Sequence, residues 1–158
     1  MSSADRVVHL LREHGRTLAT AESLTAGLLA STIAEVPGCS SVLRGGVVAY
    51  ATDVKRTALG IDELALKQVV SEAVAVGMAI GATRVLGSDI GVGTTGVAGP
   101  EWLDDQAPGT VWIAVHDARS IRTQSRLLRL TGTREEIRRG TVDACLEAIE
   151  AVVREAAP

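Results

Sequence analysis

Residues 20–27, Thr-Ala-Glu-Ser-Leu-Thr-Ala-Gly, hold the first group of side chains that could do chemistry. The pattern predicts a buried strand that ends within this segment and turns directly into a helix. The hydroxyls of Ser23 and Thr25 should therefore lie near unpaired helix N-terminal amides, which bind anions and can stabilise an oxyanion. Ser23 is thus a candidate nucleophile, and the alternative is that Ser23 or Thr25 only caps the helix.

A nucleophilic serine needs a base that accepts its proton. Two of the three histidines fall on the expected first helix and the third ends a strand, so a histidine triad is not expected. A lysine can act as the base if burial lowers its pKa enough to leave a neutral amine. Lys55 follows an apolar strand that ends near Tyr50. Spacing alone does not pair Lys55 with Ser23, because an isolated lysine is ordinarily solvated.

A glycine-rich segment, residues 91–100, is the second candidate site. Its glycines would let backbone amides approach a phosphate or ribose, and Thr94 and Thr95 would add hydroxyl donors. The segment does not open a helix as a Rossmann turn does, and it lacks the lysine of a P-loop. A plain tight loop is the alternative.

Three arginines begin the last expected helix. Arg134 and Arg138 should share one face of it and could present guanidinium groups to a phosphate or carboxylate, with Arg139 beside them. The alternative is three solvated helix arginines.

The elements that must position these residues alternate between strands and helices. Expected helices include 25–36, a short helix that carries Lys55, a long helix up to Leu86, and a last helix that starts with a capping box of Thr133 and Glu136. Expected strands are 17–21, 42–51, 89–94, 110–116 and 120–130, with a bulge or close backbone approach at Gly45 and Gly46 and a final antiparallel hairpin. This order predicts a three-layer α/β/α domain with a mixed sheet.

Composition narrows the class of protein. The 158 residues suit a single domain over 1–158, and the lack of phenylalanine predicts a core of small aliphatic side chains. A net charge of −3 argues against nucleic acid as a partner. Two distant cysteines favour neither a disulfide framework nor a metal site, and the absence of a long apolar run or a signal-like start predicts a cytoplasmic protein without membrane contact.

Several blocks, taken in order, resemble the CinA C-terminal domain family. The family's Glu-Ser-x-Thr-x-Gly block is found at 22–27 and its Tyr-x-x-x-x-Lys block at 50–55. Val-Ser-Glu at 70–72, Gly-Val-Ala-Gly-Pro at 96–100 and Gly-Thr-Val at 109–111 continue the agreement. The similarity runs from about Val7 to Val153.

The resemblance implies an amidohydrolase that converts nicotinamide mononucleotide to nicotinic acid mononucleotide and ammonia, without a metal or cofactor. It implies Ser23 as nucleophile, Lys55 as general base, and Tyr50 as a hydroxyl that positions or relays the proton. A further group is expected to contact this pyridine nucleotide, namely Thr25, Gly27, Thr95, Gly96, Ala98, Gly99 and Arg134. A homodimer or larger homo-oligomer is also expected.

Two departures from the family bear on substrate choice. Residues 101–107, Glu-Trp-Leu-Asp-Asp-Gln-Ala, replace a longer glycine-rich loop, and Ala26 stands where a second glycine is frequent. A non-catalytic nucleotide-binding or regulatory module is therefore an alternative function, and a protein-interaction domain is a third.

Overall fold

One mixed sheet forms the centre of the structure, a computed structural model that describes residues 1–157. Its strand order is β2-β1-β3-β4-β5. The first three strands run parallel, and β4 and β5 are antiparallel additions. The strands are β1 (Leu18–Glu22), β2 (Leu43–Val48), β3 (Ile90–Gly96), β4 (Thr110–Asp117) and β5 (Arg122–Arg129). The predicted mixed sheet and its terminal hairpin are confirmed.

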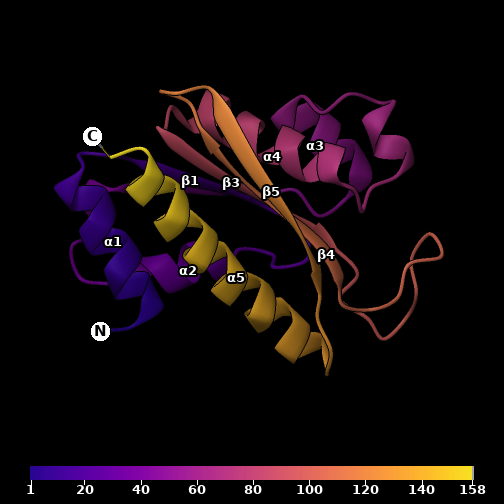
Figure 1. Cartoon of the computed structure of the whole chain (residues 1–158). Coiled ribbons are helices and arrows are strands. Elements are labelled where there is room, and N and C mark those ends of the chain that lie inside the picture. Colours follow the sequence, from indigo (N-terminus) through magenta and orange to yellow (C-terminus); the bar gives the residue numbers. More distant parts are fainter. Residues whose placement is uncertain (158) are drawn as a thin grey trace.

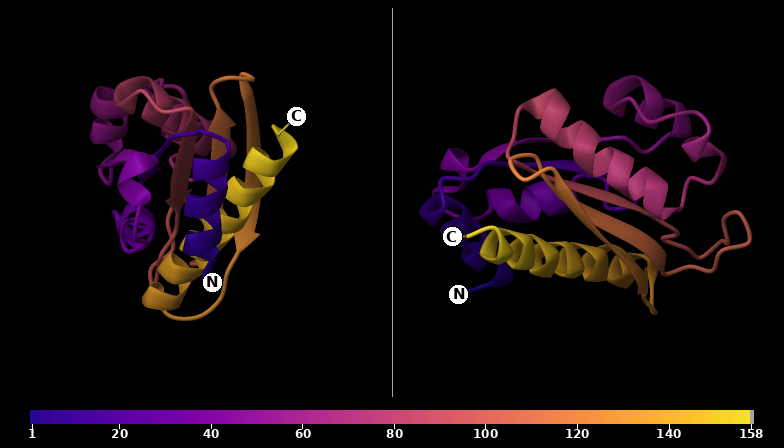
Figure 2. Two further views of the ribbon diagram at one scale, coloured as in Figure 1. Left: turned by 90° about the vertical axis from the view of Figure 1, so that its left-hand side faces the viewer. Right: turned by 45° about the horizontal axis from the view of Figure 1, so that its top comes forward.

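Helices cover both faces of this sheet, as Figures 1 and 2 show. The helices α1 (Ser3–Glu13), α2 (Leu28–Ala34) and α5 (Arg134–Glu155) pack together on one face. The helices α3 (Thr52–Leu59) and α4 (Glu72–Leu86) lie on the other, and short 3₁₀ turns span Cys39–Ser41 and Ala65–Lys67. The chain therefore has the three layers that its sequence predicts. Within residues 1–157, no helix is both long and apolar enough to cross a bilayer.

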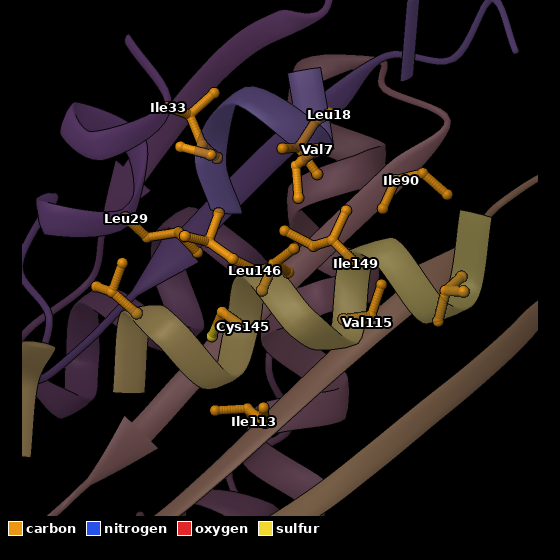
Figure 3. Close-up of a cluster of buried hydrophobic side chains, with 14 of the residues drawn as sticks. Val7, Leu18, Leu29, Ile33, Ile90, Ile113, Val115, Cys145, Leu146 and Ile149 are labelled. Carbon is orange, nitrogen blue, oxygen red and sulfur yellow. The ribbon is translucent and has the colours of Figure 1, made fainter. Parts of the chain in front are cut away.

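The larger core lies between the sheet and the layer of α1, α2 and α5 (Figure 3). It is built from aliphatic side chains, with Leu18 and Ile90 from the sheet meeting Leu29 and Ile149 from the helices. Cys145 is completely buried in this core, and burial raises the pKa of its thiol. This thiol is therefore a packing group rather than a reactive one.

On the opposite face, α4 packs against β3 at a distance that only glycine permits. A Cβ added to Gly91 would lie 2.1 Å from the Ala79 carbonyl oxygen, and one added to Gly93 would lie 2.3 Å from that of Ala75. The expectation that these two glycines admit a ligand is therefore wrong, because they admit the backbone of a helix. The predicted close approach at Gly46 is confirmed, since a Cβ there would lie 2.5 Å from Thr20 Oγ1.

The segment between β1 and α2 differs from its prediction. The helix begins at Leu28 rather than at Thr25. Ala26 and Gly27 both have positive φ angles, +48° and +92°, and this left-handed pair forms a turn before the helix starts. The extra turn moves Ser23 away from the helix N-terminus, which changes what can bind there.

Candidate active site

The site lies where the carboxyl ends of the three parallel strands meet. From β1 the chain goes to β2 on one side and then returns to β3 on the other, so β1 is the point at which the strand order reverses. Ligands of open α/β sheets bind at the carboxyl ends of strands at such a switch point. Ser23 is the first residue after β1 and therefore occupies the expected position for a ligand-contacting residue.

Ser23 and Lys55 are brought together at this edge. The distance from Lys55 Nζ to Ser23 Oγ is 2.9 Å, although the two residues are 32 positions apart. Lys55 lies in the first half of α3, which follows the end of β2 directly. Its side chain is completely buried, and only a small part of Ser23 is exposed. The solvated lysine, which was the alternative from sequence, is therefore wrong.

Three oxygen atoms surround the Lys55 amine, and a charged amine could donate to all three. Nζ lies 2.8 Å from both the Ala49 and Tyr50 carbonyl oxygens. A neutral amine has two N–H donors and one lone pair, so it can satisfy both carbonyls and accept the Ser23 hydroxyl proton. Burial lowers the pKa of Lys55 from 10.5 to about 8. No carboxylate in the described part of the chain forms an ion pair with this amine.

The side chain of Glu22, directly before Ser23, binds backbone amides at the N-terminus of α2. Its carboxylate is buried and accepts from the backbone N–H groups of Leu29 and Ala30 at 2.8 and 3.1 Å, and from the Thr20 hydroxyl at 3.0 Å. The expected anion site at these amides is therefore wrong, because the protein's own carboxylate occupies it. The sequence offered one signal for this residue: an acidic side chain at the end of a fully buried strand needs a partner.

Two contacts fix the turn that carries Ser23. The Arg138 guanidinium, from α5, donates to the Leu24 carbonyl at 2.9 Å and to the Thr25 carbonyl at 3.0 Å. The Thr25 hydroxyl lies 3.0 Å from that of Thr94 in the buried interior. Arg138 therefore braces the turn rather than presenting itself to a phosphate, which corrects one expectation.

Thr25 and Gly27 do not line the pocket beside Ser23. Thr25 is completely buried below the turn, and Gly27 stands at the N-cap of α2 with its left-handed φ. Both residues shape the turn next to Ser23, and their contact with substrate stays a prediction.

Tyr50 and Arg134 form a pair at the edge of the site. The Tyr50 hydroxyl accepts a hydrogen bond from Arg134 at 2.7 Å, and Arg134 also donates to the Gly99 carbonyl. Among the described residues the Tyr50 hydroxyl bonds neither Ser23 nor Lys55, so this residue reaches the amine only through its backbone carbonyl. Arg139 instead pairs with Glu135 on the surface.

A pocket of about 400 Å³ opens above the Ser23 and Lys55 side chains. This volume falls within the usual range of small-molecule sites, roughly 300 to 1,000 Å³. The Thr95 hydroxyl, in its wall, donates to the Val69 carbonyl at 2.9 Å. Most of the residues expected to contact substrate line this pocket, namely Thr95, Gly96, Ala98, Gly99 and Arg134. Tyr50, expected to position or relay a proton, lines it too.

Residues 101–107, the loop that differs from the family pattern, also contribute to the pocket. Leu103 and Gln106 exchange two backbone hydrogen bonds around Asp104 and Asp105, whose φ angles of +48° and +60° are those of a tight two-residue turn. The Gln106 side chain donates to the Val70 carbonyl at 3.0 Å. The loop is thus a short hairpin attached to the pocket wall by the Gln106 side chain.

Comparisons with known proteins identify the family of this chain. The family model of the CinA C-terminal domain matches residues 1–153. A CinA-like protein of Frankia casuarinae is 45% identical over 145 residues, which cover 90% of this chain and 33% of that protein. One from Salinibacter ruber is 48% identical over 111 residues, 68% of this chain and 27% of that protein. The chain thus spans about a third of the length of these curated relatives.

Solved structures match over nearly the whole chain. Competence damage-inducible protein A of Klebsiella pneumoniae superimposes with a TM-score of 0.94 at 28% identity, covering 98% of this chain and 97% of that one. The competence/damage inducible protein CihA of Agrobacterium tumefaciens gives a TM-score of 0.90 at 33% identity, covering 94% and 92%. The fold is therefore shared over both full lengths.

Proposed function

Because the chain belongs to the CinA C-terminal domain family, we propose that it hydrolyses the carboxamide of a pyridine nucleotide, nicotinamide mononucleotide, with Ser23 as nucleophile and Lys55 as base. The observation that carries the proposal is the buried 2.9 Å contact between Lys55 Nζ and Ser23 Oγ, at the floor of a pocket of about 400 Å³. Serine hydrolases need both features, an activated hydroxyl and a cavity that holds the acyl group.

In the first half of the reaction, Ser23 Oγ attacks the carboxamide carbon while neutral Lys55 takes its proton. The resulting ammonium group then gives a proton to the amide nitrogen, the carbon–nitrogen bond breaks, and ammonia leaves. An ester on Ser23 remains. In the second half, Lys55 takes a proton from water and the hydroxide attacks the ester. The ester carbon–oxygen bond breaks, Lys55 returns the proton to Ser23 Oγ, and nicotinic acid mononucleotide leaves.

A backbone amide of β3 is our candidate for holding the oxyanion. Val97 N–H donates to Thr110 across the antiparallel pair, so the N–H of Gly96 points the other way, toward Ser23. The parallel ladder would bond that N–H to the Ser23 carbonyl, but this carbonyl accepts instead from Ala26 at 3.1 Å. We therefore assign Gly96, which lines the pocket, the role that we first gave to the helix amides.

The test is ammonia release from nicotinamide mononucleotide by the purified protein. The chain has two lysines, so Lys67→Met on the surface is the matched control for Lys55→Met. The proposal predicts a loss on the order of 10³-fold or more in Ser23→Ala and Lys55→Met, and wild-type turnover in Lys67→Met. Nucleotide binding without ammonia release by wild type would favour the non-catalytic module instead.

A further inference from the structure

An unpacked indole stands at the mouth of the pocket. The Trp102 side chain is 67% exposed, which is unusual for the residue type that gains most from burial. It lines the pocket of Ser23 and also a second hollow, which contains Trp112 and Leu127, so there is open space on two sides of it. This side chain contributes little to the core and is free to cover a ligand.

The backbone that holds Trp102 is nevertheless fixed. The next residue, Leu103, starts the two-residue turn closed by two hydrogen bonds with Gln106, at 3.1 and 2.8 Å. The Gln106 side chain ties this turn to Val70, another residue of the pocket wall. A large aromatic surface on a fastened turn can be buried by a ligand at small entropic cost.

The charges near Trp102 indicate what kind of ring it would cover. Glu101, the preceding residue, also lines the pocket, and its carboxylate favours positive charge at this end. The Arg134 guanidinium, which also lines the pocket, donates hydrogen bonds to the Tyr50 hydroxyl and the Gly99 carbonyl. The face of an indole attracts cations more strongly than any other side-chain ring. The nicotinamide ring of an oxidised nucleotide is a pyridinium cation, whereas its 1,4-dihydro form is neutral.

We propose that Trp102 is a specificity-determining residue that stacks on the cationic pyridinium ring of the substrate and so selects the oxidised over the reduced nucleotide. This inference rests on the proposed function, because the ring must carry the carboxamide that reaches Ser23. The reduced ring also has a less electrophilic carboxamide, so turnover alone cannot isolate the stacking. Binding to an inactive variant can.

The experiment measures dissociation constants of nicotinamide mononucleotide, oxidised and reduced, by calorimetry on Ser23→Ala protein. Trp102→Leu in that background should weaken binding of the oxidised form about tenfold and of the reduced form much less. Trp102→Phe, which keeps an aromatic face, should retain most of the preference. Because Trp102 is exposed, both variants should unfold at the wild-type temperature.

A second readout uses fluorescence. The chain has two tryptophans, so Trp112→Phe leaves Trp102 as the single indole, and the oxidised nucleotide should quench its emission. Equal losses for both forms in Trp102→Leu, or no quenching on binding, would overturn the stacking while leaving the amidase proposal intact. Quenching and an oxidised-form preference without ammonia release by wild type would support the stacking and overturn the amidase.

Discussion

Lys55 Nζ lies 2.9 Å from Ser23 Oγ, and its other two polar contacts are backbone carbonyls rather than carboxylates. A carboxylate partner would hold the amine in its charged form, whereas two carbonyls satisfy the two N–H groups of a neutral amine. The pair is therefore arranged so that the lone pair of the amine can face the serine hydroxyl. The proposed activity therefore depends on the protonation state of Lys55.

The first prediction concerns that protonation state. Burial lowers the pKa of Lys55 to about 8, and Lys67, the other lysine of the chain, is exposed. In protein labelled with ¹³C at lysine Cε, the signal that disappears in Lys55→Met should titrate near pH 8. In the proposed mechanism the neutral amine is the base, so kcat/KM should rise with pH and level off above about pH 8. A Lys55 signal that titrates near the ordinary lysine value, about 10.4, would contradict the assignment.

A second prediction concerns Glu22. Its buried carboxylate accepts two backbone N–H bonds at the start of α2, so Glu22→Ala leaves both donors without partners. We expect the free energy of unfolding to fall by about 2–4 kcal/mol in urea. Glu22→Gln, which keeps one acceptor oxygen, should lose less. Glu35→Ala, an exposed acid at the other end of the same helix, should change stability by less than about 0.5 kcal/mol. Wild-type stability in Glu22→Ala would rule out the capping role.

Glu22 also illustrates what the sequence could and could not provide. The buried strand before it and the helix after it were predicted, because apolar periodicity depends on nearest neighbours in the chain. The partners of its carboxylate were not, because two left-handed residues, Ala26 and Gly27, turn the chain back toward it. The sequence gives no sign of this conformation at Ala26, because alanine rarely adopts a positive φ.

The third prediction concerns the contact of β3 with α4. Gly93→Ala would place a Cβ 2.3 Å from the Ala75 carbonyl oxygen, so the helix must move away from the sheet. We expect a loss of about 3 kcal/mol or more in the free energy of unfolding. The matched control is Gly77→Ala within α4, where the nearest atom would be at 3.4 Å, an ordinary contact. That change should stabilise the protein by about 0.5–1 kcal/mol. Equal effects of the two substitutions on thermal unfolding would contradict the account.

The fourth prediction separates two neighbouring arginines. Arg138 donates to the carbonyls of Leu24 and Thr25, whereas Arg139 pairs only with Glu135 on the surface. Arg138→Ala should therefore lower kcat about tenfold or more with little change in KM, since misplacing a nucleophile affects the chemical step. Arg138→Lys should retain part of the kcat that Arg138→Ala loses. Arg139→Ala should leave kcat and KM at wild-type values. A loss of kcat in Arg139→Ala as large as that in Arg138→Ala would contradict the role of the Arg138 hydrogen bonds.

The residues near Trp102 show a different limit of sequence reasoning. The Ser23, Lys55 and 96–100 segments were identified from the blocks that resemble a family, and the structure brings them to one pocket. Residues 101–107 depart from that family, so no resemblance could assign them. The hairpin that they form, in which Leu103 and Gln106 pair across a two-residue turn, was therefore not predicted. The antiparallel hairpin of β4 and β5, by contrast, followed from two alternating strands and a short connection.

The most direct test of the central claim, that Ser23 attacks the carboxamide of a pyridine nucleotide, is mass spectrometry of the protein quenched in acid during turnover. Wild-type protein mixed with nicotinamide mononucleotide should gain the mass of the nucleotide less ammonia, on the peptide that contains Ser23, and Ser23→Ala should show neither this adduct nor ammonia release. Ammonia release that persists in Ser23→Ala, or an adduct on a different residue, would contradict the account.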